Sequence, residues 1–433
     1  MGSTGTRPKA LMVVEPRFAT DHIGVRRVIA NYWTRLRRHG FEVELGVISG
    51  GHLYRVSSSA SEATYAIITG ARRGVDLITW ESSAPPAHQM QGRRALRSRA
   101  GPRGNYLLSA PDLEVHLEQE CSTSEFDLSV LSNAWLCSQT MPADRFTHGI
   151  VYDLVPNLLA AQILDFGSPS FGVLEFANAH HRGYEYFLDH VSTILCISES
   201  TKRDFVRYYL PDRSIHVLVD IPFDIDDFLN EFTPPAVTTL DKEPAKVLLV
   251  NILDPRKNVA QVAAALASVS VNVPMEINVV GKERFADQSE ALVYFRTMAA
   301  HGARVRWYRD ASDELLRYLY SSAQVLVFPS LYEGLGLPLL EAQSFGTPVI
   351  SGANSSLLEV NFNEMLFVDP SSSTDIATTV RTLLDGTLPV DRGHTLAALT
   401  RAYLDKNHRF EGNLNQLCAQ MGSERAGDTS NED

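Results

Sequence analysis

Residues 324–351 read QVLVFPSLYEGLGLPLLEAQSFGTPVIS and contain the alternation of segments that is typical of an α/β protein. The apolar runs at 324–330 and 347–351 have the length of buried strands, and the residues from Pro338 onward are typical of a helix. Proline is favoured in the first turn of a helix, where the amide has no partner within the helix. The segment LYEGLGLP is therefore predicted to be a loop that joins the carboxyl end of a strand to a helix.

The chemistry of this loop indicates a binding site for an anion and a polyol. Gly334 and Gly336 allow the backbone to approach a ligand closely, and the start of the helix adds free amides and a partial positive charge. Glu333 lies in the loop, and Glu341 is placed in the first turn of the helix. Because a carboxylate accepts two hydroxyl donors, the pair suits the vicinal diols of a ribose or a hexose.

The C-terminal half repeats this pattern of strands and helices, which predicts a parallel sheet covered on both faces. Ligands bind at the carboxyl ends of the strands in such sheets. The segment LDPRKN (253–258) follows a predicted strand and presents Arg256 and Lys257, two cations that suit a diphosphate. Further strands are predicted at 246–252, 275–281, 304–308 and 364–369.

The N-terminal half begins as a second α/β unit. An apolar run at 10–15 is followed by a polar loop with Gly24, and then by a helix that ends near Gly40. Gly24 is predicted to let the backbone of this loop approach the same phosphates across a cleft between the two domains. Further strands are predicted at 76–80, 126–131, 149–155, 193–198 and 215–219.

The domain organisation follows from these patterns and from a segment rich in proline and short polar residues. We expect an N-terminal domain and a C-terminal domain, both Rossmann-like and doubly wound. The C-terminal helical segment could return to the N-terminal domain, and the last residues are too polar to pack. The predicted boundaries are 1–232 for the first domain, 233–245 for the linker, 246–390 for the second domain, 391–421 for the helical segment and 422–433 for a disordered tail.

Composition excludes several classes of protein. A net charge of −12 over 433 residues argues against a nucleic-acid binder, and no apolar run reaches the ~18 residues of a membrane span. Without a leader pattern or cysteine pairs at ligand spacing, the chain is expected to be cytoplasmic with reduced thiols. One basic stretch is either a solvated surface loop or a peripheral contact with the anionic inner face of a membrane; it contains Arg93, Arg94, Arg97, Arg99 and Arg103.

Several motifs together resemble the family-4 glycosyltransferases, which are retaining, nucleotide-sugar-dependent enzymes of the GT-B fold. The segment EGLGLPLLE (333–341) is similar to the E-x7-E signature of that family, and LDPRKN is similar to its EPRKN loop. YDLVP (152–156) resembles HDLIP, and ILCISESTKRDF (194–205) resembles VIAVSEATRRDL. The resemblance is strong over about 245–385 and patchy before it, and it implies that the N-terminal domain binds the acceptor and the C-terminal domain binds the nucleotide sugar.

The resemblance implies a role for each matching residue. Glu341 would bind the ribose and Glu333 the transferred sugar. A phosphate oxygen of the donor would deprotonate the acceptor, which requires neither a metal nor another cofactor. The resemblance to mannosyl- and rhamnosyltransferases of polysaccharides favours GDP- or dTDP-linked donors. The diphosphate would be held by Arg256 and Lys257, together with the backbone amides of Gly334, Leu335, Gly336 and Leu337.

Two departures from the family pattern keep other functions open. Tyr152 stands where many members have a histidine before Asp153, and Ile252 stands where many have an arginine. Asp153 either serves the active site or caps a turn before Pro156. His180 and His181 are candidates to contact the sugar or the acceptor in place of the missing histidine.

The leading hypothesis is therefore transfer of a sugar to a glycan, a lipid-linked glycan or a small molecule, in polysaccharide or glycoconjugate biosynthesis. The alternatives are a nucleotide-sugar epimerase of the same fold, or a partner subunit that binds nucleotide sugars without catalysis.

Overall fold

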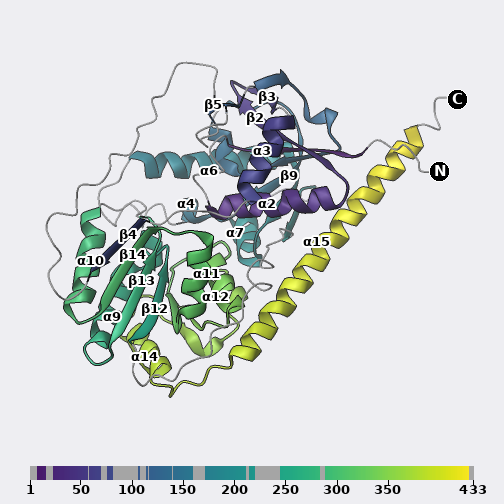
Figure 1. The fold of residues 1–433 in the computed structure, drawn as a ribbon. Coiled ribbons are helices and arrows are strands. Elements are labelled where there is room, and N and C mark those ends of the chain that lie inside the picture. The colour runs from purple at the N-terminus through teal and green to yellow at the C-terminus, as the bar shows by residue number, and fades with distance from the viewer. Residues whose placement is uncertain are drawn as a thin grey trace. The chain divides into compact units, whose positions relative to one another are not determined.

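The computed structural model describes residues 7–15, 23–56, 58–69, 76–80, 106–107, 114–115, 117–138, 140–158, 171–210, 214–219, 244–282 and 288–428. The chain divides into two compact units (Figure 1). Unit 1 comprises residues 1–70, 105–224 and 401–433, and unit 2 comprises residues 71–104 and 225–400.

Unit 1 is built on a sheet whose strand order is β11-β10-β9-β8-β1-β2-β3-β7. The six strands from β11 to β2 run parallel, and β3 and β7 extend the sheet in antiparallel fashion. The strands are β1 (Lys9–Val13), β2 (Glu42–Ser49), β3 (His52–Val56), β7 (Leu117–Glu120), β8 (Leu128–Leu131), β9 (Phe146–Val151), β10 (Val191–Cys196) and β11 (His216–Val219), with the separate pair β5 (Tyr106–Leu107) and β6 (Glu114–Val115).

The helices of unit 1 bury the apolar positions that the sequence pattern indicated. In the helix after β1, Ile29, Tyr32, Trp33 and Leu36 are fully buried, because their spacing places them on one face. The helical elements are α2 (Ile23–Arg38), α3 (Ser58–Thr69), η1 (Thr123–Glu125), η2 (Ala134–Ser138), α4 (Val155–Leu158), α6 (Phe171–His190) and α7 (Glu199–Tyr209), joined by the later part of α15 (Arg392–Asp428).

Unit 2 contains a sheet with the order β17-β16-β15-β12-β13-β14-β4. Its strands are parallel except β4, which pairs antiparallel with β14. The strands are β4 (Asp76–Trp80), β12 (Ala245–Val250), β13 (Met275–Val280), β14 (Arg304–Asp310), β15 (Val325–Phe328), β16 (Val349–Gly352) and β17 (Phe367–Val368).

Helices cover both faces of this sheet, as the uniformly apolar strands predicted. Side chains of α9, α10 and α14 form one continuous core with Val247, Ile277 and Val327, and α11 and α12 lie on the opposite face (Figure 1). The helical elements are η3 (Pro255–Lys257), α9 (Val259–Ser270), α10 (Gln288–Ala300), α11 (Asp313–Ser322), α12 (Leu337–Ser344), α13 (Leu357–Val360), η4 (Glu364–Leu366), α14 (Ser373–Leu384) and the start of α15. The prediction of two Rossmann-like α/β domains is confirmed.

The structure corrects two predicted boundaries. β4 was assigned to the N-terminal domain but lies at the edge of the unit 2 sheet; an edge strand can pair with any part of the chain, so sequence order did not reveal this. Helix α15 continues to Asp428, seven residues into the predicted disordered tail, and its residues from 401 onward belong to unit 1. Nearly all of the predicted linker at 233–245 lies outside the described residues.

Candidate active site

A cluster of buried charges lies at the carboxyl ends of two neighbouring strands of unit 2. Asp254, Arg256 and Lys257 follow β12, and Glu333 follows β15. The two loops are joined by a backbone hydrogen bond of 2.8 Å from Leu331 N to Arg256 O. The structure therefore brings together three of the residues that the sequence singled out, although 76 positions separate Lys257 from Glu333.

Glu333 is the centre of this cluster. Its side chain accepts hydrogen bonds from Lys257 Nζ, from Arg256 Nη1 at 3.3 Å and from Ser330 Oγ at 2.6 Å. Arg256 also pairs with Asp254 Oδ2 at 3.0 Å. Lys257 is only 4% exposed and Glu333 only 6%, so these charges require the partners that they have.

The electrostatics keep this cluster ionised at neutral pH. Burial lowers the pKa of Lys257 to about 8, and Glu333 opposes the shift. Burial works against the charged form of Glu333 too, but Arg256 and Lys257 together outweigh it and hold the pKa of Glu333 below its usual range. The ring of Phe328, centred 4.1 Å from Lys257 Nζ, adds a cation–π contact.

A third loop, after β16, fixes the position of Glu333. Ser355 Oγ accepts a hydrogen bond of 2.9 Å from Glu333 N, and Ser356 Oγ donates one of 3.0 Å to Glu333 O. Asn354 donates to Ser330 O at 2.9 Å. These side chains were not among the predicted site residues; the signal that could have found them is a run of small polar residues directly after a strand.

The glycine loop and the start of α12 agree with the predicted arrangement. Gly336 caps the helix with φ +90°, a conformation that residues with a side chain rarely adopt. A Cβ atom there would also lie 3.2 Å from Leu357 Cδ2. The amides of residues 334–337 thus belong to a turn that leads into a helix, the geometry that suits an anion.

Glu341 occupies a different place from the predicted one. It is the fifth residue of α12, so it lies in the second turn rather than the first. The side chain is 4% exposed, and Tyr320 OH donates to its Oε2 at 2.7 Å. This hydrogen bond orients the carboxylate, and the assignment to ribose hydroxyls stays a prediction.

Two predicted site residues of unit 1 lie in local structure that the sequence did not settle. Asp153 Oδ1 accepts a hydrogen bond of 3.0 Å from Val155 N, so this side chain caps the turn before Pro156, which was the structural alternative. Gly24 was predicted in a loop, but α2 begins at Ile23 and includes it in the first turn. Whether either residue also contacts a ligand stays a prediction.

Unit 1 carries a second polar cluster, which is built on aromatic rings. The ring of Trp135 lies 5.2 Å from that of His180 and 6.3 Å from that of Tyr152. Trp135 Nε1 donates to Glu15 Oε2 at 2.6 Å. The hydroxyl of Tyr152 is buried and has no hydrogen-bond partner among the described residues. We call Glu15, Trp135, Tyr152 and His180 the ring cluster.

The topology explains why the ring cluster forms. Glu15, Trp135 and Tyr152 follow β1, β8 and β9, which are neighbours in the parallel sheet. Glu15 and Trp135 were missed by sequence reasoning, although each stands within four residues of the end of a strand. His181 is not part of the cluster: its ring nitrogens contact Tyr209 OH at 3.2 Å and Glu185 Oε1 at 3.3 Å.

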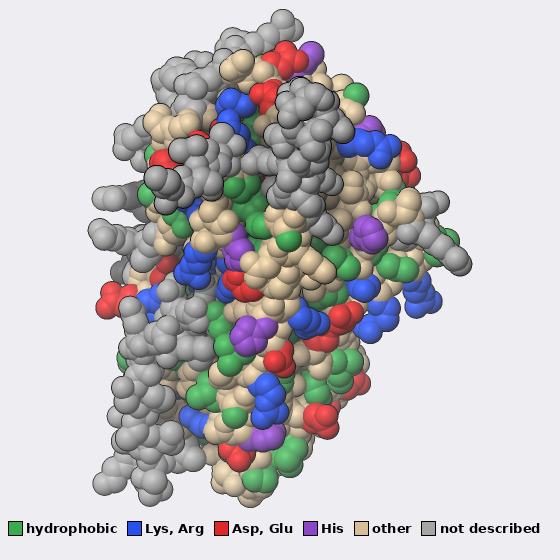
Figure 2. All heavy atoms as spheres, turned by 90° about the vertical axis from the view of Figure 1, so that its right-hand side faces the viewer, with side chains coloured by type: hydrophobic (Ala, Val, Ile, Leu, Met, Phe, Trp, Pro, Cys, Tyr) green, Lys and Arg blue, Asp and Glu red, His purple; other side chains and the backbone are tan. Residues whose placement is uncertain are grey.

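The remaining predictions concern features that the described residues cover only in part. The arginines at 93–103 lie outside them, so the contact with an anionic membrane stays a prediction. On the face drawn in Figure 2, the described acidic and basic side chains are interspersed, and neither sign covers a continuous area. All four cysteines are free. Within the described part of the chain, no helix is both long and apolar enough to span a bilayer, and no three His, Cys, Asp or Glu side chains are grouped for a metal.

Comparisons with known proteins give matches over parts of the chain. Residues 232–396 match the family model of the glycosyl transferases group 1. The O-antigen chain mannosyltransferase B of Escherichia coli is 27% identical over 190 residues, which are 42% of this chain and 49% of that protein. An MMP alpha-(1->4)-mannosyltransferase of Mycolicibacterium hassiacum is 35% identical over 108 residues, 24% of this chain and 25% of that protein. The chain thus spans about half the length, or less, of these curated relatives.

Solved structures share the fold at low sequence identity. The pneumococcal O-GlcNAc transferase, solved with UDP and GlcNAc, has a TM-score of 0.56 at 9% identity, over 96% of this chain and 100% of that one. The sucrose-phosphate synthase of Thermosynechococcus elongatus has a TM-score of 0.54 at 16% identity, with the same coverage of both chains. The protein therefore has the GT-B fold, and residues 232–396, within its second unit, are similar to the group 1 glycosyl transferases.

Proposed function

We propose that the protein transfers a hexose from a nucleoside-diphosphate sugar to the growing end of a glycan or a lipid-linked glycan. The observation that carries this proposal is the meeting of Arg256, Lys257 and Glu333 at the carboxyl edge of the unit 2 sheet. Two cations and the start of α12 provide positive charge for a diphosphate, and a carboxylate beside them can accept sugar hydroxyls.

The chemistry that these residues can perform is electrostatic. As the bond between the sugar and the diphosphate breaks, negative charge grows on the leaving group, and the cations and helix amides stabilise it. In the retaining mechanism that we propose, a phosphate oxygen of the donor takes the proton of the acceptor hydroxyl. The protein therefore supplies positioning and charge, and it needs no carboxylate base.

The names of the relatives support a proposal for the sugar that is transferred and for its nucleotide. Two of them are named as O-antigen chain mannosyltransferases, so we propose a mannosyl donor, GDP-linked, with a dTDP-linked sugar as the alternative. The ring cluster of unit 1 is proposed to bind the acceptor, because aromatic rings combine an apolar surface with polar edges.

The test is a donor panel with the full chain. GDP-mannose, dTDP-rhamnose and UDP-glucose are supplied with glycan acceptors, and release of the nucleoside diphosphate is measured. We expect release from GDP-mannose to exceed the others by at least about tenfold, the equivalent of about 1.4 kcal/mol in the barrier. Binding without release from every donor would instead favour the alternative of a non-catalytic binding subunit.

We also predict that the reaction is independent of metals, because Arg256, Lys257 and the α12 amides already supply positive charge. Activity should survive exhaustive chelation unchanged. The matched measurement adds Mg²⁺ or Mn²⁺ back to the chelated enzyme, and a recovery that depends on the metal would contradict this prediction.

A further inference from the structure

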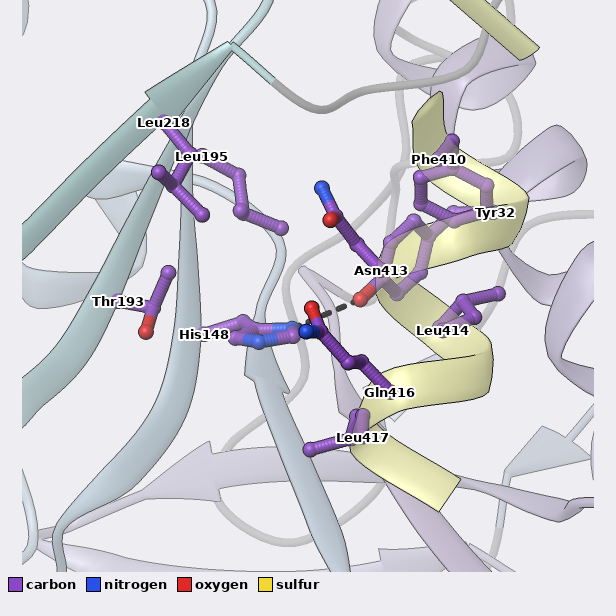
Figure 3. Close-up of a pocket in the computed structure, with 10 residues that line it drawn as sticks. All are labelled: Tyr32, His148, Thr193, Leu195, Leu218, Phe410, Asn413, Leu414, Gln416 and Leu417. Carbon is purple, nitrogen blue, oxygen red and sulfur yellow. Dashed lines mark hydrogen bonds between the residues drawn. The ribbon is translucent and has the colours of Figure 1, made fainter. Parts of the chain in front are cut away.

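A cavity of about 180 Å³ lies within unit 1, between its sheet and helix α15 (Figure 3). The strand side is formed by Thr193 and Leu195 of β10, His148 of β9 and Leu218 of β11. Thr193 pairs with His148 in the parallel ladder and Leu195 pairs with Leu218, so these side chains share one face of the sheet. They lie within the strands, whereas the ring cluster follows the carboxyl ends, so the cavity is a separate site.

The helix side shows the spacing of a single helical face. Phe410, Asn413, Leu414 and Leu417 stand at positions i, i+3, i+4 and i+7 of α15, and all four line the cavity. Three of the four are apolar, and the amides of Asn413 and of Gln416 line the cavity as well. In Figure 3, Asn413 and Leu417 extend from the helix toward the strands.

His148 gives the cavity its polar end. Its Nδ1 is hydrogen-bonded to Tyr32 OH at 2.8 Å (Figure 3), and its Nε2 has no partner among the described residues. Burial lowers the pKa of His148 to about 4, so the ring is neutral at physiological pH. Nε2 is then a donor or an acceptor, depending on the direction of the bond to Tyr32.

The lining excludes most ligands of a glycosyltransferase. No Lys, Arg, Asp or Glu is among the described residues that line the cavity, so a nucleotide or a diphosphate would be buried without a counter-charge. A wholly apolar ligand would leave His148 Nε2 unpaired. A hydroxyl satisfies Nε2 in either tautomer, because it both donates and accepts.

We propose that this cavity binds a small neutral alcohol with a hydrocarbon or aromatic body. The volume sets its size, since an apolar cavity of about 150 Å³ holds benzene. The hydrocarbon body packs against Leu195, Leu414 and Leu417, and the hydroxyl bonds to His148 Nε2. Such a ligand contacts the sheet and α15 together, so its binding stabilises the attachment of that helix to unit 1.

The experiment uses benzyl alcohol as the probe and benzoate as its anionic counterpart, with the full chain and isothermal titration calorimetry. We expect saturable binding of benzyl alcohol, at least tenfold tighter than binding of benzoate. Equal affinity for the two, or no saturable binding of benzyl alcohol, would overturn the proposal.

A matched pair of variants locates the ligand. Leu218 is 38% exposed at the rim, so Leu218→Trp has room to obstruct the cavity, and Leu404 of α15 is 46% exposed outside the lining. Leu218→Trp should weaken binding at least tenfold, whereas Leu404→Trp should leave it unchanged. If Leu218→Trp does not fold, hydrogen exchange of the wild-type protein tests the site instead. Benzyl alcohol should slow amide exchange within residues 410–417. Unchanged exchange there would refute the site.

Discussion

The polar clusters of the two units differ in how their groups are satisfied. In unit 2, Glu333 has three side-chain partners and Lys257 is enclosed by a carboxylate and a ring. In unit 1, Trp135 is paired with Glu15, but the buried hydroxyl of Tyr152 has no partner among the described residues. An unpartnered hydroxyl costs a few kcal/mol, whereas an unpartnered buried charge costs far more.

This difference indicates how each cluster relates to its ligand. A charge network must be complete whether or not a ligand is bound, so its ligand has to compete with internal partners. A buried neutral hydroxyl can remain without a partner until a ligand binds, because leaving it unpaired costs only about 1–3 kcal/mol. Under the proposed function, the charged cluster of Asp254, Arg256, Lys257 and Glu333 would be both a binding site and a structural element, and the ring cluster is expected to be mainly a binding surface.

The largest effect should come from Lys257→Ala. Loss of one cation at a developing charge costs about 10²–10³ in kcat. A side chain in a loop would ordinarily contribute little to the stability of the core. However, Lys257 is buried and paired, and breaking such a pair costs about 3–5 kcal/mol of stability. Steady-state kinetics and thermal unfolding measure the two effects separately.

The control for this variant is Lys257→Met combined with Glu333→Gln, which removes both charges. We expect much of the stability to return while kcat stays low. Near-normal kcat in folded Lys257→Ala would mean that the diphosphate is held by the amides of residues 334–337 alone.

A pH profile tests the same lysine. With the pKa of Lys257 at about 8, activity should fall by about tenfold per unit once the pH is above this value, because the neutral amine no longer offsets the diphosphate charge. The free energy of unfolding should instead increase with pH over this range. The unfolded lysine titrates near 10.4, so between about 8 and 10.4 the unfolded state binds more protons, and this residue makes stability rise with pH.

The matched variant for the profile is Lys257→Arg, which keeps its charge throughout this range. Its residual activity should show no decline above pH 8. A wild-type profile that stays flat to about pH 10 would show that the ionisation of Lys257 does not control the reaction.

Glu341→Ala should have a smaller effect and a different signature. A hydroxyl contact that is present in both ground and transition states contributes to KM rather than kcat. We expect the donor KM to rise about tenfold, or about 1.4 kcal/mol, with kcat nearly unchanged. Tyr320→Phe is the control, since it removes the internal hydrogen bond to Glu341 and costs about 1 kcal/mol of stability. A lower Tm with unchanged KM in Glu341→Ala would make this carboxylate purely structural.

The smallest effect is expected in the ring cluster of unit 1. Trp135→Ala should raise the acceptor KM several-fold, by the equivalent of about 1 kcal/mol, and leave the donor KM unchanged. Trp135→Phe keeps an aromatic ring but loses the hydrogen bond to Glu15. Its acceptor KM should lie between that of the wild type and that of Trp135→Ala. A change in the donor KM instead of the acceptor KM would place this cluster in donor binding.

Local patterns in the sequence determined the helices, strands and turns of this protein and much of its fold. Apolar strands of uniform character alternate with helices, which indicates parallel sheets because only a sheet covered on both faces buries such strands. The turn at Gly336 and the start of α12 followed from glycine and proline, whose conformational preferences are local. The grouping of Arg256, Lys257 and Glu333 followed from a further rule, that carboxyl ends of parallel strands share one edge.

Tertiary structure alone decided the features that depend on distant partners. The pairing of β4 with β14 joins residues 76–80 to 304–310, and no local pattern specifies which free edge a strand will join. The ionic bonds of Glu333, the hydrogen bond from Tyr320 to Glu341 and the meeting of Trp135 with Tyr152 likewise depend on packing. The physical reason is that burial and pairing are properties of the assembled core, whereas helix, turn and strand preferences reside in a few neighbouring residues.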